Sequence, residues 1–274
     1  MSNLGKRAIV AVCLLGVLAL MLIFGGWIQA AVFTFGAVVS VLEMSRMFKN
    51  KGINICMPPL IVQAGLQTVL LILISEYGLP KFTLPALFII VVLYIVTERI
   101  LNRNRTTEDF IATMFVMVYP LLFIMCFGLF GFNRTDVSRI ALFMVFAGPS
   151  MADNNAYLFG SKLGKHKLCP SISPNKTVEG YIAGLIGGPI GGLLVYFMQK
   201  LWGFDVHWAW LVGLGFLGAV IGQFGDLLAS TFKRWSGIKD FGNLFPGHGG
   251  VMDRIDSAML FAPVIAFVFW YFIR

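Results

Sequence analysis

Acidic and basic side chains are concentrated near the C-terminus of this sequence, at spacings that suit chemistry on anionic substrates. The segment from Ser230 to Asp256 reads STFKRWSGIKDFGNLFPGHGGVMDRID and lies between two apolar runs. Asp226 lies four residues before Ser230, and Lys233 lies three residues after it. A helix would therefore place all three side chains on one face. Asp253 and Asp256 are three apart and would share a face in the same way. Such carboxylates are suitable ligands for a hard divalent cation such as Mg2+.

The same segment also supplies positive charge and an open turn. Phe245-Pro246-Gly247 and Gly249-Gly250 predict a tight turn whose exposed backbone N–H groups would form an anion cradle. His248 lies in this turn, but no second His or Cys stands at a metal-ligand spacing, so we do not expect a transition-metal site. Four basic residues would balance the charge of a phosphate-bearing substrate, namely Lys233, Arg234, Lys239 and Arg254. The groups together are those required for phosphoryl or nucleotidyl transfer.

A second polar segment precedes the first one in the chain. MADNNAYLFG places Asp153 within an apolar run, where a carboxylate is costly unless it faces a cavity, a cation or a partner. A buried structural ion pair is the alternative for Asp153. Lys176 follows a Ser-Pro pair and precedes a predicted helix start, which suits contact with an anionic ligand. The basic loop around it would otherwise hold anionic lipid head groups.

The elements that must position these residues are membrane helices. Of the 274 residues, 58% are hydrophobic and 12% are charged, and the mean hydropathy is +0.84. These values exclude an ordinary soluble protein and predict an all-α integral membrane protein. A transmembrane helix needs about 20 apolar residues. By that measure we expect about nine spans, at 8–25, 28–47, 59–77, 83–100, 111–131, 138–160, 178–199, 208–232 and 256–273.

The distribution of Lys and Arg predicts the orientation. If the nine spans alternate, 16 of the 21 Lys and Arg residues fall on the side of the N-terminus. The positive-inside rule then places the N-terminus and both polar segments in the cytoplasm. The net charge of +8 lies in short loops rather than on a soluble face, so anionic lipid and anionic substrate are expected rather than nucleic acid. We expect residues 1–135 to form a scaffold and residues 136–274 to form the catalytic region.

Several other features are expected to be structural. The glycine-rich run GYIAGLIGGPIGGLL lacks the Lys-Ser/Thr of a nucleotide loop, and its four-residue spacing favours close helix packing. Glu43 and Glu98, near helix ends, are expected to be solvated or paired with Arg. The cysteines show no CxxC spacing and are expected to act as small hydrophobic residues.

The spacing within the C-terminal segment is similar to a known family signature. It resembles the signature of the phosphatidate cytidylyltransferases, which are also called CDP-diacylglycerol synthases. The matching residues are Ser230-x-Phe232-Lys233-Arg234-x4-Lys239-Asp240-x-Gly242-x2-Phe245-Pro246-x-His248-Gly249-Gly250-Val251-x-Asp253-Arg254-Ile255-Asp256. Two further stretches resemble the same family, Asp153-x-x-Ala156-Tyr157-x-x-Gly160 and Ser173-Pro174-x-Lys176-Thr177-x-Glu179-Gly180. The resemblance covers about the last half of the chain, from these stretches onward.

The resemblance implies an Mg2+-dependent condensation of CTP with phosphatidic acid, giving CDP-diacylglycerol and pyrophosphate. It implies one or two cations held by acidic residues, with Asp226 and Asp253 as the first choices of ligand and Asp256 and Asp153 as the second choices. The groups that would neutralise or orient the phosphates are Lys233, Arg234, Lys239, His248 and Arg254, with a turn-stabilising role as the alternative for His248. The remaining residues expected to bind CTP are Asp153, Lys176, Ser230, Gly249 and Gly250.

The resemblance also implies partners and a location. The expected partners are CTP, phosphatidic acid, membrane lipid and a second copy of the chain in a homodimer. The expected location is the cell (inner or plasma) membrane, with the active site on its cytoplasmic face. A CDP-archaeol synthase or a CTP-dependent polyprenol kinase is the nearest alternative. A transporter is a more distant one, because the polar residues gather in two loops on one side rather than along several helices.

Overall fold

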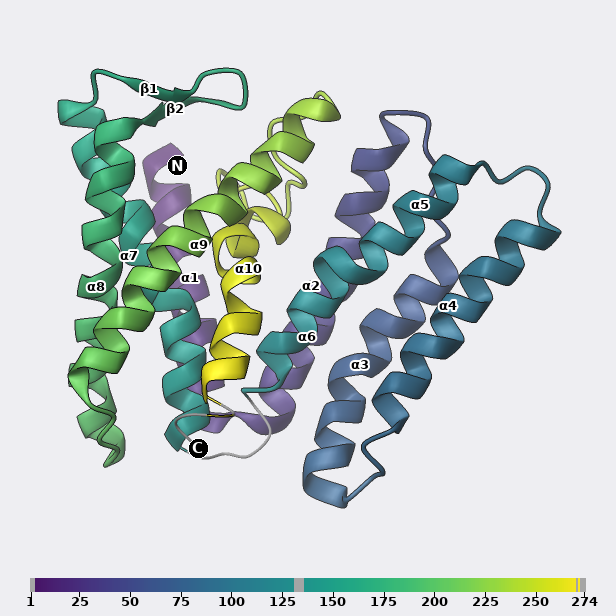
Figure 1. Ribbon diagram of the computed structural model, residues 1–274, viewed down its shortest axis with the longest axis horizontal. Coiled ribbons are helices and arrows are strands. Elements are labelled where there is room, and N and C mark those ends of the chain that lie inside the picture. The colour runs from purple at the N-terminus through teal and green to yellow at the C-terminus, as the bar shows by residue number, and fades with distance from the viewer. Residues whose placement is uncertain (1–2, 131–135, 270, 272–274) are drawn as a thin grey trace. The chain divides into compact units, whose positions relative to one another are not determined.

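The protein is nearly all-α, as the sequence predicts (Figure 1). The computed structural model describes residues 3–130, 136–269 and 271. Within the described chain, six helices are long and apolar enough to cross a membrane, and these are Gly26–Lys49, Met57–Tyr77, Thr83–Leu101, Thr107–Gly128, Val178–Trp202 and Trp208–Trp235. The nearly all-α fold is therefore confirmed and six helices are candidate spans, whereas the count of nine and the orientation of the N-terminus stay predictions.

The chain forms two compact units. The first unit comprises residues 1–133 and 236–254, and the second comprises residues 134–235 and 255–274. The chain thus leaves the second unit after Trp235 and returns to it at Ile255, so most of the polar C-terminal segment belongs to the first unit. The expected functional boundary at residue 135 stays a prediction.

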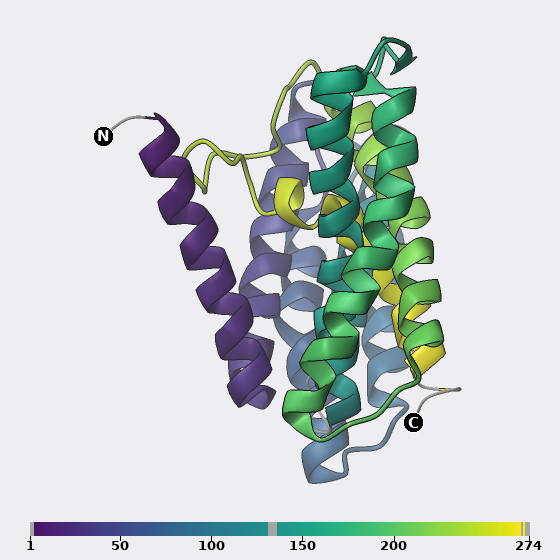
Figure 2. The same cartoon turned by 90° about the vertical axis from the view of Figure 1, so that its left-hand side faces the viewer.

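The first unit consists of helices joined by short turns. They are α1 (Asn3–Phe24), α2 (Gly26–Lys49), α3 (Met57–Tyr77), α4 (Thr83–Leu101), α5 (Thr107–Val116), a π-helical turn (Met117–Leu122) and α6 (Phe123–Gly128). Gly25 joins α1 to α2 at a positive φ of 55°, a conformation that glycine adopts without strain. Figure 2 shows that α1 diverges from α2 as it runs back from this turn toward the N-terminus.

Buried glutamines support the interruption between α5 and α6. Pro120 lies inside the π-helical turn, where it removes a backbone N–H donor and leaves neighbouring carbonyl groups without their helical partner. Gln63 and Gln67 of α3 donate to the carbonyl oxygens of Met117 and Leu121, at 3.1 and 3.0 Å. These bonds tie α3 to residues on both sides of Pro120 and give each carbonyl group a hydrogen-bond donor from another helix.

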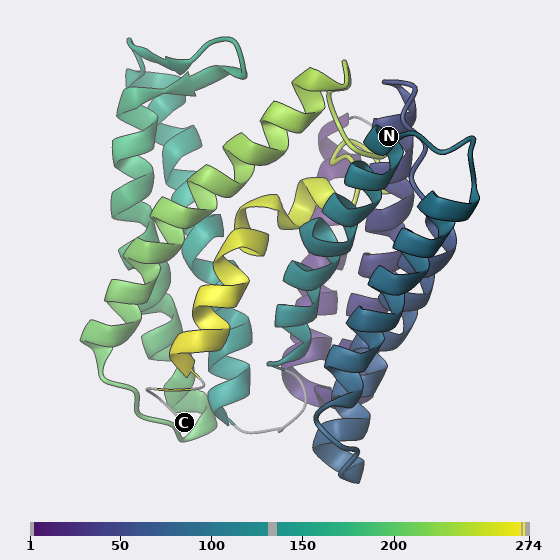
Figure 3. The same ribbon diagram turned by 45° about the vertical axis from the view of Figure 1, so that its right-hand side comes forward.

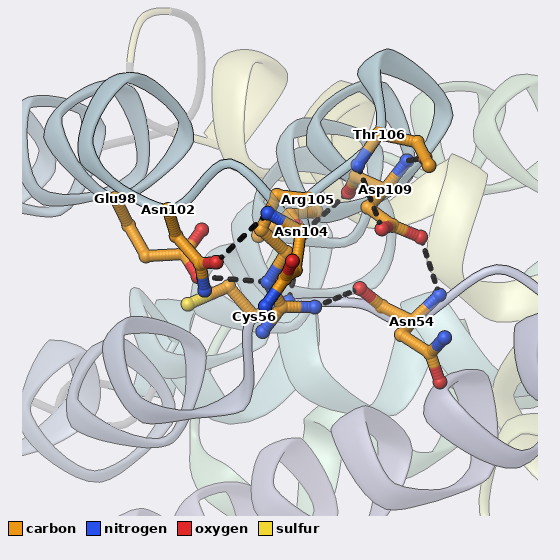
Figure 4. A network of polar contacts seen from close by, with 9 residues as sticks. Asn54, Cys56, Glu98, Asn102, Asn104, Arg105, Thr106 and Asp109 are labelled. Carbon is orange, nitrogen blue, oxygen red and sulfur yellow. Dashed lines mark hydrogen bonds and ion pairs between the residues drawn. The ribbon is translucent and has the colours of Figure 1, made fainter.

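A polar network connects two loops of the first unit (Figure 4). Arg105 forms an ion pair of 2.7 Å with Glu98 and also donates to the carbonyl oxygen of Asn54. Asp109 accepts from the backbone N–H of Asn54 at 2.6 Å and forms a capping box with Thr106 at the start of α5. The loop after α2 is thereby fixed to the loop after α4. Of the two states expected for Glu98, solvated or paired with Arg, the structure shows the Arg pair.

The second unit is a helical bundle with a short hairpin. Its elements are α7 (Asp136–Leu163), β1 (Lys167–Cys169), β2 (Ser173–Thr177), α8 (Val178–Gln199), a 3-10 turn (Lys200–Trp202), α9 (Trp208–Trp235) and α10 (Met252–Val268), whose first three residues are assigned to the first unit. The two strands pair antiparallel, and the hairpin lies over the adjoining ends of α7 and α8 (Figure 3).

Glycines bring the backbones of α7, α8 and α9 into contact. A Cβ added at Gly188 would collide with the backbone oxygen of Gly215 in α9. A Cβ added at Gly191 would lie 2.6 Å from the backbone oxygen of Ala147 in α7. The packing role predicted for the glycine-rich run is thus confirmed.

Candidate functional site

Two of the predicted site residues meet directly in the second unit. Lys176 in β2 places Nζ 2.6 Å from Oδ2 of Asp226 in α9. Ser230 lies one turn further along α9 and donates from its hydroxyl to Oδ1 of Asp226 over 3.4 Å. The helix face predicted for Asp226 and Ser230 is confirmed, and the hairpin adds a cation to it.

A second lysine and acid lie beside this pair. Lys233 and Asp256 are each 8% exposed, and Nζ of the lysine is 3.9 Å from Oδ2 of the aspartate. Asp256 also interacts electrostatically with Asp226 and Asp153. Acids at such proximity repel one another and need compensating positive charge. We call the following five residues the acid–lysine cluster: Lys176, Asp226, Ser230, Lys233 and Asp256.

A glycine allows α10 to approach α9 at the cluster. A Cβ added at Gly225 would lie only 2.5 Å from the backbone oxygen of Asp256. Without a side chain at position 225, α10 comes close enough for Asp256 to approach Lys233.

The hairpin that carries Lys176 is held at both ends. Thr177 accepts a hydrogen bond from the N–H of Gly180 at 3.1 Å and thereby caps the start of α8. Gly160 of α7 fits against this joint, because an added Cβ would lie 2.9 Å from Oγ1 of Thr177. Arg234 at the end of α9 donates to the carbonyl oxygen of Ile172 at 3.2 Å. Arg234 therefore has a structural contact as well as the phosphate-binding role predicted for it.

The sequence from Phe245 to Gly250 forms the predicted tight turn in the first unit. Phe245 donates to the carbonyl oxygen of Gly249 at 2.9 Å, and His248 donates back to that of Phe245 at 2.8 Å. Gly247 and Gly249 have φ angles of 77° and 81°, which a side chain would strain. Nδ1 of His248 is buried and has no hydrogen-bond partner among the described residues.

Asp253 binds the backbone of the same loop. Its Oδ2 accepts from the N–H of Phe241 at 2.8 Å and from that of Gly250 at 2.9 Å. The N–H groups of Phe245, His248 and Gly250 are therefore all bonded inside the loop. The prediction that backbone N–H groups here stand open as an anion cradle is wrong for these three, because the loop uses them to close itself.

Glu43 is the functional candidate that the sequence interpretation missed. It is only 2% exposed, and its two carboxylate oxygens accept from the N–H groups of Val251 and Met252, each at 2.9 Å. The expectation of a solvated carboxylate is wrong for this residue, which binds backbone N–H groups and interacts electrostatically with Arg46. One available signal was its place in an otherwise apolar helix, since an acid in such a helix is costly unless it has a specific partner.

The predicted residues divide between the two units. The acid–lysine cluster, Asp153 and Arg234 belong to the second unit, whereas Lys239, His248, Gly249, Gly250, Asp253 and Arg254 belong to the first. Lys239 and Arg254 are exposed, so their charges are accessible to an anion. In the described ranges no three acidic, imidazole or thiol side chains gather into one metal-binding group.

The donor set of the cluster nevertheless fits Mg2+. This ion is commonly bound by one or two carboxylates together with water and substrate phosphates. Asp226 and Asp256 supply two carboxylates that repel each other, and a cation between them would relieve that repulsion.

Comparison with known proteins identifies the family. The chain matches the model of the cytidylyltransferase family over residues 5–272. It is 32% identical to the phosphatidate cytidylyltransferase of Staphylococcus aureus (strain COL), covering 94% of this chain and 96% of that protein. It is also 32% identical to the phosphatidate cytidylyltransferase of Bacillus subtilis (strain 168), covering 96% and 97% of the two chains. The protein therefore belongs to the cytidylyltransferase family.

Proposed function

We propose that the protein is an enzyme that condenses CTP with phosphatidic acid to form CDP-diacylglycerol and pyrophosphate in phospholipid biosynthesis. The observation that carries this proposal is the acid–lysine cluster, which unites acids and lysines from β2, α9 and α10 in a protein with six helices long and apolar enough to cross a membrane among its described residues. The full-length similarity to phosphatidate cytidylyltransferases supports the choice of nucleotide and lipid.

The reaction requires positioning more than proton transfer. A phosphate oxygen of phosphatidic acid attacks the α-phosphorus of CTP and forms a new P–O bond. The bond from the α-phosphorus to the oxygen that bridges to the β-phosphorus breaks, and pyrophosphate leaves with the electron pair. Because the attacking phosphate is already ionised near neutral pH, no strong base is needed. The protein must hold two anions that repel each other and stabilise the charge of the leaving group.

Asp226 and Asp256 are the proposed ligands of Mg2+. Asp253 is a third candidate, although its Oδ2 already accepts two backbone hydrogen bonds, which leaves fewer lone pairs for a cation. When bound, one or two such cations supply positive charge for the triphosphate.

The basic side chains would bind the phosphates. In the second unit these are Lys176, Lys233 and Arg234, and the CTP-binding roles proposed for Ser230 and Asp153 fall in the same unit. In the first unit, Lys239 and Arg254 offer exposed charge, and His248 would orient a phosphate by a hydrogen bond. Gly249 and Gly250 serve by shaping the turn that carries His248.

The proposed location is the cell membrane, with about nine spans and the active site facing the cytoplasm, where CTP is available. The excess of Lys and Arg on the side of the N-terminus supports this orientation. A homodimer is proposed from the family resemblance.

Product analysis tests the proposed reaction. Purified protein in detergent should convert labelled CTP and phosphatidic acid into CDP-diacylglycerol and pyrophosphate only when a divalent cation is present. Release of CDP with phosphorylation of a polyprenol would identify a kinase instead. A preference for an archaeol phosphate would identify a CDP-archaeol synthase, and absence of any CDP-lipid would contradict both transferases.

A further inference from the structure

A carboxylate in α2 holds the start of α10. The N–H groups in the first turn of a helix have no partner within the helix and need one from elsewhere. Glu43 gives one carboxylate oxygen to the N–H of Val251 and the other to that of Met252, at 2.9 Å each. The two residues are preceded by the turn that carries His248 and followed by Asp253 and Arg254.

The loop is shaped around this carboxylate. Gly242 and Gly250 both face Glu43, and a Cβ added at either position would collide with its Oε1. The loop backbone therefore approaches Glu43 from two points, and only glycine permits the approach. Gly242 and Gly250 both belong to the stretch that resembles the family signature. The contact with Glu43 gives a structural reason for glycine at these two positions.

Two acids together fix the loop at both ends. Asp253 ties Phe241 to Gly250, while Glu43 ties the end of the loop to α2. The four backbone N–H groups involved are held by charge-assisted hydrogen bonds, which are stronger than neutral ones. Glu43 itself is nearly inaccessible, so it does not act as a ligand for a substrate at the surface.

We propose that Glu43 is a positioning residue for the transfer reaction, because it fixes the loop that presents Lys239, His248 and Arg254. This inference rests on the proposed function. Catalysis by positioned groups is sensitive to small displacements, and a misplacement of about 1 Å can cost about a hundredfold in rate. Loosening this loop should therefore reduce turnover without removing any group that contacts the substrates.

The decisive variant is Glu43→Gln, which keeps the size of the side chain. Its amide offers one acceptor oxygen, and its NH2 group would face an N–H donor, so one of the two bonds is lost. Glu76→Gln is the matched control, because Glu76 is an exposed carboxylate near the end of α3. Amide hydrogen exchange of a peptide covering Val251 and Met252 measures the loop directly.

We expect Glu43→Gln to increase exchange in this peptide and to lower kcat per folded molecule about 10- to 100-fold, with a smaller change in KM for CTP. Glu76→Gln should match the wild type in both measurements. Unchanged exchange in Glu43→Gln would overturn the proposal. Faster exchange with a wild-type kcat per folded molecule would also overturn it, since the role would then be structural only.

A double variant tests the contact without relying on catalysis. Gly242→Ala should increase exchange because its new methyl group displaces Glu43, whereas Glu43→Ala makes room for it. The two effects should therefore be strongly non-additive in Glu43→Ala/Gly242→Ala. Additive effects would contradict the proposed contact. A wild-type protein that forms no CDP-lipid would contradict the proposed function, while the exchange data would still decide whether Glu43 holds the loop.

Discussion

Lys176 and Asp226 form an ion pair of 2.6 Å that joins the hairpin strand β2 to helix α9. The pair is only partly exposed, and Asp226 has a second acid, Asp256, in its electrostatic surroundings. Lys176 is therefore part of the charge balance of the acid–lysine cluster, although it comes from a different segment of the sequence.

Replacing Lys176 by methionine should lower kcat by about 10² to 10³, the usual cost of losing one preorganised group that stabilises transition-state charge. Lys167→Met is the matched control, since Lys167 is an exposed lysine of the same hairpin and should change turnover little. Steady-state release of pyrophosphate provides the measurement. Equal activity of the two variants would exclude a role for Lys176 in the reaction.

Asp226→Asn and Asp256→Asn should each reduce turnover at least about a hundredfold, because the proposed Mg2+ site would lose a charged oxygen ligand. Titration of activity with Mg2+ after treatment with EDTA is the measurement. Asp205→Asn, at an exposed loop residue, should retain the wild-type Mg2+ dependence. A normal Mg2+ titration in either cluster variant would show that its carboxylate is not a ligand.

The same titration assigns Asp253. If this residue only holds the loop, Asp253→Asn should lower the melting temperature, because one carbonyl oxygen cannot replace the carboxylate fully. The Mg2+ requirement should then stay unchanged. A raised Mg2+ requirement would instead make Asp253 a metal ligand.

Gly225→Ala should disturb the approach of α10 to α9. The added methyl group would lie 2.5 Å from the backbone oxygen of Asp256, and overpacking of this kind costs about 1–3 kcal/mol of unfolding free energy. Gly213→Ala in the same helix meets no atom within 4 Å and should be neutral or stabilising. Thermal unfolding in detergent compares the two. A Gly225→Ala protein as stable as Gly213→Ala would contradict the close helix contact.

Two cysteines report on orientation and burial. In variants that retain only one cysteine, Cys169 in the hairpin should react with a membrane-impermeant maleimide in inside-out vesicles but not in right-side-out vesicles. Burial raises the pKa of the Cys56 thiol, so a smaller fraction of it is the reactive thiolate at neutral pH. Cys56 should therefore be labelled more slowly than Cys169, and its labelling rate should increase with pH. Labelling of Cys169 from the outside would reverse the proposed topology.

Local spacing predicted the parts of the site that lie within one element. The shared face of Asp226 and Ser230 and the turn after Phe245 follow from helix geometry and turn chemistry. These features depend on residues that are neighbours along the chain, so periodicity and composition were sufficient to identify them.

The pairings between elements were beyond sequence reasoning. Lys176 could reach many anions, and only the packing of the hairpin determines that Asp226 is its partner. The carboxylate of Glu43 was expected to be solvated or paired with Arg, because no local pattern indicates that backbone N–H groups from a distant loop would bind it. Asp253 likewise forms bonds to the backbone that depend on how the loop closes.

The hydrogen bond from Val251 to Glu43 spans 208 positions of the chain, which has a consequence for biogenesis. At a synthesis rate of about 5–20 residues per second, Glu43 emerges from the ribosome about 10–40 s before its partner. During this interval, an acid in an apolar helix lacks the N–H donors that stabilise it in the finished protein. Membrane insertion of α2 thus precedes completion of the first unit, which must wait until the segment that contains Val251 has been translated.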